Sequence, residues 1–195
     1  MNFDEIKQRF NATINEMAET LYRNNEIIDY EKITQFIDHL IKIYTNNRMV
    51  FLYGAGRSGF IGKCFTQRLM HLGFKACFIS DTVTYRYKTE DLLIIISGSG
   101  ETITPNAIAK KAKQIGGTVV LLTANPLSTI GRLCDLTIQI EGKTKDKATV
   151  NNTLAPYTSL FDISTLAVLD AIAGIIMEKL GVSEKQIDMR HATLE

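Results

Sequence analysis

The sequence predicts an α/β protein built on a doubly wound, five-stranded parallel sheet flanked by helices. Three observations predict this fold class. From residue 49 onward, short apolar runs typical of buried strands alternate with helical stretches. Two turns rich in glycine and serine, 54–59 and 97–102, each follow such a run and precede a helix. Two amphipathic helical stretches come before the first strand.

The N-terminal region is helical in pattern over residues 3–24 and 29–45. Apolar side chains recur there every three or four residues, as in the series Phe3, Ile6 and Phe10. Such a stripe can pack against the core of its own chain or against a partner subunit. The sequence leaves both interpretations open.

The elements that follow alternate between strand and helix. We expect strands at 49–53, 75–79, 91–96, 118–123 and 134–140, and helices at 58–72, 104–115, 127–132 and 160–180. Polar stretches around 81–88 and at 141–156 are expected to be loops. In such sheets a ligand binds beyond the carboxyl ends of the strands, which is where both glycine-rich turns fall.

Composition favours one soluble globular domain covering residues 1–195, with a helical extension at 1–47. Hydrophobic residues make up 45% of the chain, and 22 basic against 21 acidic residues give a formal charge of +1. This balance predicts no nucleic-acid partner and no polybasic membrane contact. The polar start is no secretory signal, and the longest apolar run, 166–177, contains Asp170 and is too short to span a bilayer. We therefore expect a cytoplasmic protein.

The cysteines and histidines predict neither a disulfide nor a metal site. Cys64, Cys77 and Cys134 show no CxxC spacing, and we expect all three to be reduced and buried. The three histidines lie far apart and lack the spacing of a metal-binding motif.

The two glycine-rich turns have the composition of an anion-binding site. Residues 97–102 (SGSGET) follow the apolar run 92–96, and residues 54–59 (GAGRSG) follow 49–53. Glycine lets the backbone approach a ligand closely, hydroxyls add hydrogen-bond donors, and a helix start offers unpaired N–H groups. We therefore expect a phosphate-bearing small molecule at two neighbouring strand ends.

Two other interpretations of these turns remain open at this point. Residues 54–59 match the dinucleotide fingerprint GxGxxG, and Asp81 lies near the spacing of a ribose-binding acid. However, that fingerprint expects a strand at the start of the domain, and a nicotinamide site does not call for a second serine-rich turn. Alternatively, both turns are only tight connections without a ligand.

Four segments resemble the 6-phospho-3-hexuloisomerase family, which belongs to the sugar isomerase (SIS) domain group. They are 54–59 (GAGRSG), 68–74 (RLMHLGF), 97–102 (SGSGET) and the ending 190–195 (RHATLE). The serine-glycine turn marks any SIS domain, whereas 68–74 and the ending narrow the resemblance to this branch.

This resemblance implies an isomerase that interconverts D-arabino-hex-3-ulose 6-phosphate and fructose 6-phosphate through a 2,3-enediolate, without a metal or redox cofactor. Members of the family act in carbohydrate metabolism, in the ribulose monophosphate pathway of formaldehyde fixation. They are cytoplasmic homotetramers whose active sites are completed across subunits. The partners to expect are thus a phosphosugar and further copies of the chain.

The resemblance also assigns residues to the substrate. The hydroxyls of Ser97, Ser99 and Thr102 would bind the phosphate, assisted by the backbone N–H groups of Gly100 and Glu101. Their structural alternative is turn formation and helix capping. A helix starting as late as Pro105 would still leave Thr102 in the turn.

At the sugar end we expect Gly56, Arg57 and Ser58. Arg57 would orient a hydroxyl or stabilise the enediolate, or else be a solvated loop charge.

The expected base is Asp162. The family carries a glutamate in a Leu-Phe-Glu context at the start of its last long helix, and the matching stretch here is Leu160-Phe161-Asp162. Aspartate is shorter by one methylene, and Ser159-x-x-Asp162 also has the pattern of a capping box, which would stabilise the carboxylate and lower its basicity. Glu101 is the reserve candidate for the base.

Two histidines complete the expected site. His71 lies in the segment that matches the family, which favours a role as a proton shuttle or as a hydrogen-bond donor to a substrate oxygen, in its own site or in that of a neighbouring subunit. The alternative for His71 is a core or interface side chain. His191, in the C-terminal tail, could close over the substrate.

Two other functions remain open beside this isomerase. The chain could be an SIS isomerase of another phosphosugar, or a non-catalytic phosphosugar sensor, which the aspartate at position 162 would suit. A sensor of this kind usually carries a DNA-binding domain, and the sequence contains no basic helix-turn-helix segment.

Overall fold

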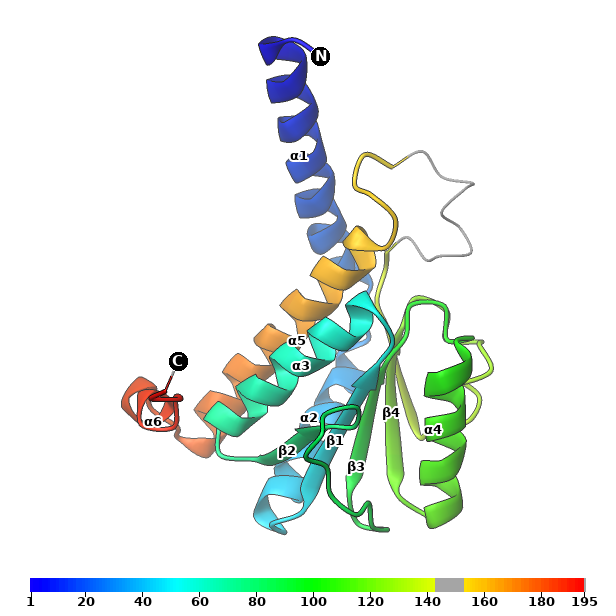
Figure 1. Ribbon diagram of the computed structural model, residues 1–195, viewed down its shortest axis with the longest axis vertical. Coiled ribbons are helices and arrows are strands. Elements are labelled where there is room, and N and C mark those ends of the chain that lie inside the picture. The colour runs from blue at the N-terminus through cyan, green and yellow to red at the C-terminus, as the bar shows by residue number, and fades with distance from the viewer. Residues whose placement is uncertain (143–152, 195) are drawn as a thin grey trace.

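Five parallel strands form the centre of the protein, as a computed structural model of residues 1–142 and 153–194 shows (Figure 1). Their order is β2-β1-β3-β4-β5. The bounds are β1 Met49–Gly54, β2 Lys75–Phe78, β3 Leu92–Ile96, β4 Thr118–Thr123 and β5 Leu136–Gln139. The predicted doubly wound, five-stranded parallel sheet is thereby confirmed.

Helices cover both faces of this sheet (Figure 1). The helices are α1 Phe3–Ile27, α2 Tyr30–Thr45, α3 Arg57–His71, α4 Ile103–Ile115, α5 Ser159–Leu180 and α6 Glu184–Asp188. Strand residues alternate between the two sides, so that Ile94 packs in the cluster with α2, α3 and α5, and Leu93 in the cluster with α4. Because both faces are covered, β3 is apolar throughout and fully buried.

The strand order fixes where a ligand can bind. From β1 the chain crosses through α3 to β2 on one side, and it then returns to β3 on the other side of β1. The carboxyl ends of β1 and β3 therefore lie next to each other, with Gly54 paired with Ile96. A reversal of strand order at this point opens a crevice between the two connecting turns.

Helix α1 extends beyond the body of the protein (Figure 1). A capping box of Asn2 and Glu5 starts it, and its last turns are fixed to the sheet because the Asn24 side chain bonds both backbone groups of Glu141. In the outer half, Phe3 and Phe10 are 78% and 64% exposed. The outer half of the apolar stripe predicted for this helix is thus not covered by its own chain.

The connection from β4 to β5 differs from the prediction. Residues 127–132 form consecutive turns and no helix. The reason is that the N–H of Ile130 donates to the carbonyl of Gly100, 3.1 Å away, in place of a carbonyl in its own segment. Strand β5 is also shorter than expected, and α6 was not predicted.

The start of α4 also differs slightly from the prediction. Helix α4 begins at Ile103, so Thr104 is helical although it precedes Pro105. Proline is tolerated there because the N–H groups of the first helical turn have no partner within the helix. The expected loop 141–156 lies partly outside the described residues, as does Glu195 of the C-terminal motif.

One helix among the described residues, α5, is long and apolar enough to cross a membrane by length and composition alone, contrary to our expectation. Half of it is buried, and it packs against α1, α2 and α3. A core helix of a soluble protein has the same composition.

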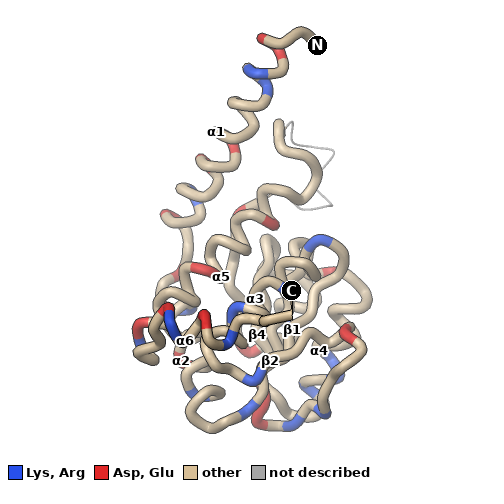
Figure 2. Tube along the Cα trace, turned by 60° about the vertical axis from the view of Figure 1, so that its left-hand side comes forward, with Lys and Arg blue, Asp and Glu red and all other residues tan. Residues whose placement is uncertain are grey.

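Charged residues are interspersed along the chain. Figure 2 shows Lys and Arg, and Asp and Glu, distributed over helices and loops alike.

Candidate active site

The two glycine-rich turns meet at the reversal of strand order. The first joins β1 to α3 and the second joins β3 to α4, and β1 pairs directly with β3. The predicted position of both turns at neighbouring strand ends is therefore confirmed.

Between the turns lies a cavity of about 300 Å³. It is lined by three groups of residues: Ala55, Gly56, Arg57 and Ser58 of the first turn, Ile96, Ser97, Gly98, Ser99 and Thr102 of the second, and Tyr157, Thr158 and Phe161 from the start of α5. The third group was not assigned to the site from sequence, because 157 and 161 carried no signal beyond packing. Six of the predicted site residues line the cavity.

The second turn offers hydroxyl donors to this cavity. The Ser97 Oγ accepts the N–H of Gly100 and the Ser99 Oγ accepts the N–H of Glu101, both at 3.2 Å. Each hydroxyl therefore keeps its own proton to donate. Thr102 stands at the N-cap position of α4, yet its side chain caps no N–H. The geometry suits an anion, although the N–H groups expected to assist are used within the turn.

Two glycines allow this backbone. Gly56 and Gly100 have φ angles of 57° and 65°, in the left-handed region that side chains disfavour. Gly100 does not line the cavity. It packs so closely against Ser128 that a Cβ atom would overlap that hydroxyl.

Asp162 lies beside the cavity in the first turn of α5 and is 2% exposed. Its Oδ2 accepts hydrogen bonds from the Arg57 Nε at 2.7 Å and from the Thr158 hydroxyl at 2.9 Å. Its Oδ1 has no hydrogen-bond partner among the described residues. A buried carboxylate with one oxygen unsatisfied is costly in a merely structural position, and such groups gather at functional sites.

The predicted capping box at this helix start is wrong. Thr158 is the N-cap, Ser159 is the first helical residue, and the Thr158 side chain bonds Asp162 and no backbone N–H. The carboxylate of Asp162 is instead bonded to Arg57 and to the Thr158 hydroxyl.

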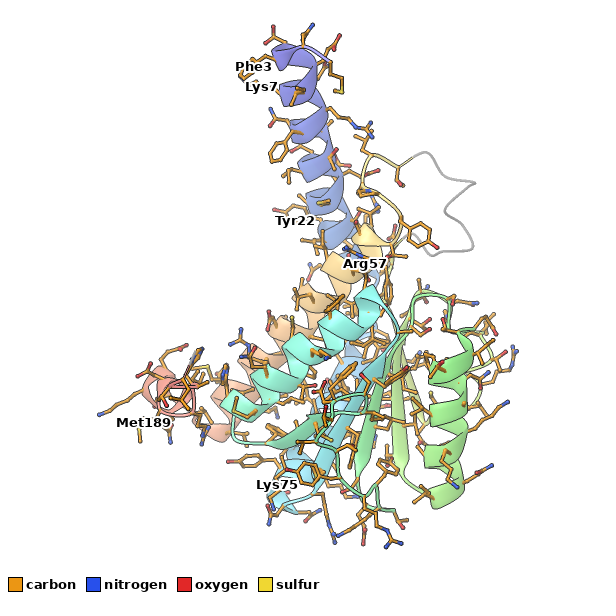
Figure 3. The ribbon with its side chains drawn as sticks, viewed as in Figure 1. Phe3, Lys7, Tyr22, Arg57, Lys75 and Met189 are labelled. Carbon is orange, nitrogen blue, oxygen red and sulfur yellow. The ribbon has the colours of Figure 1, made fainter. Side chains whose placement is uncertain are left out.

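The Arg57 side chain forms an ion pair and yet stays largely exposed to solvent. It begins α3 next to the start of α5 (Figure 3), and its side chain is 61% exposed although its partner is buried. A guanidinium with this exposure can reach the cavity while it contacts the carboxylate.

The comparisons with known proteins agree with this geometry. The family model described as "SIS domain" matches residues 43–169. The chain belongs to the SIS domain family.

Several relatives within this family are named for one particular activity. The SIS chain is 39% identical to a 3-hexulose-6-phosphate isomerase of Methanocaldococcus jannaschii, over 84% of each chain. It is 38% identical to the 3-hexulose-6-phosphate isomerase of Bacillus subtilis, over 92% of this chain and 96% of the relative. A solved structure from Methanococcus jannaschii, for which that same activity is inferred, superposes with a TM-score of 0.77 at 35% identity, over 96% and 99% of the chains. The resemblance to the 6-phospho-3-hexuloisomerase family, another name for this activity, is thereby confirmed.

His71 and His191 lie at the other end of α3. Helix α3 has 15 residues, with Arg57 first and His71 last, so these two residues lie about 20 Å apart. The two imidazole rings stack with centroids 5.0 Å apart, and Arg190 donates to the carbonyl of His71. Within one subunit these histidines do not reach the cavity, and a role in a neighbouring subunit's site stays a prediction.

Glu101, the reserve candidate for the base, does not face the cavity. Glu101 does not line the SIS cavity, because its Oε1 accepts the N–H of Thr129 at 2.8 Å. Hydrogen bonding from the Thr129 side chain, and then from its backbone N–H, lowers the pKa of the Glu101 carboxyl from its ordinary value. Similarly, Asp81, the acid of the dinucleotide interpretation, forms an ion pair with Lys63 at 2.9 Å.

The expectation that all three cysteines are buried is wrong for one of them. All three are free, but Cys64 is exposed on α3, whereas Cys77 is buried and Cys134 partly so. Burial raises the pKa of the Cys77 thiol, and burial followed by the nearby Asp135 raises that of Cys134 to about 12. Among residues 1–142 and 153–194, no group of three or more His, Cys, Asp and Glu side chains is placed to hold a metal ion.

Proposed function

We propose that this SIS protein is a 6-phospho-3-hexuloisomerase that interconverts D-arabino-hex-3-ulose 6-phosphate and fructose 6-phosphate. One observation carries the proposal: a buried carboxylate, Asp162, lies beside a cavity whose two turns suit a phosphosugar. The relatives at 38 and 39% identity, named for this activity, support it.

The substrate phosphate would lie against the second turn. The hydroxyls of Ser97, Ser99 and Thr102 supply donors there, and the start of α4 adds the positive end of its dipole. Binding energy from the phosphate then positions the carbons at the far end of the sugar, next to Gly56, Arg57 and Ser58.

The reaction requires one base and one electrophile. Asp162 removes the proton on C2 of the 3-hexulose, the C–H electron pair forms the C2–C3 double bond, and the C3 carbonyl oxygen becomes an enediolate oxygen. The guanidinium of Arg57 stabilises that charge. The proton of the C2 hydroxyl passes to the C3 oxygen, so that C2 gains the carbonyl and C3 the hydroxyl. The electron pair of the C2–C3 double bond then takes the proton back from the carboxyl of Asp162 onto C3. The phosphate on O6 prevents a five-membered ring in the 3-hexulose, so ring opening of that substrate requires no catalytic group.

Without substrate, the base is paired with the electrophile. Asp162 can accept a carbon-bound proton only through an oxygen that Arg57 does not occupy, and its Oδ1 is such an oxygen. The exposed Arg57 side chain is also able to turn toward the oxygens of a sugar. We therefore propose that substrate binding weakens the ion pair and frees Asp162 to accept the proton of C2.

The location, assembly, pathway and partners of the protein are part of the same proposal. We propose a cytoplasmic homotetramer acting in the ribulose monophosphate pathway, with no metal or redox cofactor and neither nucleic acid nor membrane as partner. The exposed apolar stripe of α1 supports self-association, and the 20 Å between the histidines and the cavity of their own subunit supports sites shared between subunits. Residues 1–195 would form one SIS domain in which 1–47 is a helical extension.

An NMR time course of fructose 6-phosphate with the protein in D2O tests this function. We expect deuterium to enter the sugar and hexulose phosphate to appear with wild type, and both rates to fall on the order of 100-fold or more in Asp162→Asn. Asp170→Asn, an exposed change on the same helix, is the matched control and should retain the wild-type rate.

The same experiment separates the alternatives. Phosphorus shifts without exchange would contradict catalysis and indicate a sensor, which the Arg57–Asp162 ion pair would suit. Exchange into arabinose 5-phosphate in preference to fructose 6-phosphate would indicate an SIS isomerase of another phosphosugar.

A further inference from the structure

Helix α1 holds the segment that leads into α5. The carboxylate of Glu16 accepts two consecutive backbone N–H groups, from Leu154 at 3.0 Å and from Ala155 at 2.7 Å, one on each oxygen. About two helical turns earlier, Arg9 donates to the carbonyl of Leu154 at 3.2 Å. The two contacts of Glu16 join residues that lie 138 and 139 positions apart in the sequence, and the contact of Arg9 joins residues 145 positions apart.

The segment held in this way forms one wall of the candidate active site. Residues 153–158 end in Tyr157 and Thr158, which both line the cavity, and Thr158 in turn donates to Asp162. A displacement of the segment would therefore move the cavity wall and a hydrogen bond to the proposed base together.

The backbone of this segment requires support from outside. Tyr157 has a φ angle of 47°, a left-handed conformation that costs free energy for a residue other than glycine. Such a conformation persists only where surrounding contacts determine it. The two charge-assisted hydrogen bonds to Glu16 are contacts of this kind, because a carboxylate binds backbone N–H groups more strongly than a neutral acceptor does.

We propose that Glu16 is a positioning residue for the isomerase reaction: through Leu154 and Ala155 it fixes the wall formed by Tyr157 and Thr158 and thereby the orientation of Asp162. The inference rests on the proposed function, since it takes the cavity as the active site. Glu16 itself lies on a helix outside the region 43–169 that matches the SIS model.

Hydrogen–deuterium exchange tests the contact without reference to turnover. In Glu16→Gln, which puts an amide group against one of the two N–H donors, we expect the amides of Leu154 and Ala155 to exchange roughly tenfold faster than in wild type. Glu19→Gln is the matched control, because Glu19 is exposed on the same helix and its side chain forms no hydrogen bond or ion pair with the other described residues. Unchanged exchange in Glu16→Gln would overturn the proposal.

Kinetics then separate positioning from general stability. We expect kcat of Glu16→Gln to fall about tenfold while KM stays within about threefold, because neither phosphate-binding turn is altered, and Glu16→Asp to recover part of kcat. Equal kcat in Glu16→Gln and Glu19→Gln, or a loss of kcat explained by a lowered Tm, would contradict the proposal. If wild type shows no turnover at all, the proposed function fails, and the exchange measurement still decides the contact.

Discussion

The Nε of Arg57 lies 2.7 Å from the Oδ2 of Asp162, so the first residue of α3 is joined to the first turn of α5. The two residues are 105 positions apart, and the carboxylate is buried while the guanidinium is largely in solvent. The pair connects the turn that follows β1 with the element that carries the proposed base.

Arg57→Ala should destabilise the fold by about 1–3 kcal/mol. Removing one partner of a buried ion pair costs about 3–5 kcal/mol, and the exposure of the guanidinium reduces that figure. Arg68→Ala is the control, because Arg68 and Asp170 join the same two helices with both side chains in solvent, and it should cost less than about 1 kcal/mol. Urea denaturation measures both variants, and equal losses would contradict the buried character of the Asp162 pair.

Gly100→Ala should lower the free energy of unfolding by about 2 kcal/mol and raise KM for the phosphosugar. The left-handed φ angle disfavours alanine, and the new methyl group would overlap Ser128. Gly174→Ala is the opposite case, since it lies in α5 with open space around its Cβ position, and it should stabilise by about 0.5–1 kcal/mol. Thermal unfolding of both variants gives the comparison, and a stable Gly100→Ala would show that the second turn tolerates another backbone.

Cys64 should be the first thiol to react with iodoacetamide at pH 8. It is exposed, whereas burial raises the pKa of Cys77 and raises that of Cys134 to about 12, so that these two supply little thiolate. Peptide mass spectrometry should find Cys134 modified at least about tenfold more slowly than Cys64. Comparable rates would indicate that the connection from β4 to β5 opens readily.

The contact of Glu101 with the Thr129 N–H should make stability depend on pH at the acidic end. Because the folded state lowers the pKa of Glu101 below 4.5, the contact stabilises the protein above that pH, and the contribution is lost as pH falls through the lowered pKa. The stability advantage of wild type over Glu101→Gln at pH 7 should therefore shrink near pH 3. Denaturant titrations at the two pH values measure it, with Glu19→Gln as a control for surface charge, and a constant difference would contradict the assignment.

Local patterns predicted most of the sheet and both turns. The strands predicted at 49–53, 91–96 and 118–123 each contain a run of consecutive apolar residues, and a run buried on both faces needs no information from distant residues. The turns could be placed together because parallel strands end at the same edge of the sheet. The helix expected at 127–132 was wrong because Gly100, far away in sequence, accepts the hydrogen bond of Ile130.

The contacts that complete the site were beyond local patterns. The sequence around Asp162 resembles a capping box, and only the position of Arg57 shows that the carboxylate is used differently. Glu16 gave no signal at all, because an acidic residue on an amphipathic helix is ordinarily solvated and its partners are backbone groups. Such interactions become visible only when the fold has brought the segments together.

The contacts of α1 limit how far the N-terminus of the chain can be shortened before turnover is lost. A version of the chain that begins at Asp29 would retain α2, the sheet and both turns. It would lack Glu16 and Arg9 together, and with them the support of the cavity wall at 153–158. Such a fragment could bind a phosphosugar through its hydroxyls and still turn it over slowly, so the helix that precedes the family region is part of the catalytic unit that we propose.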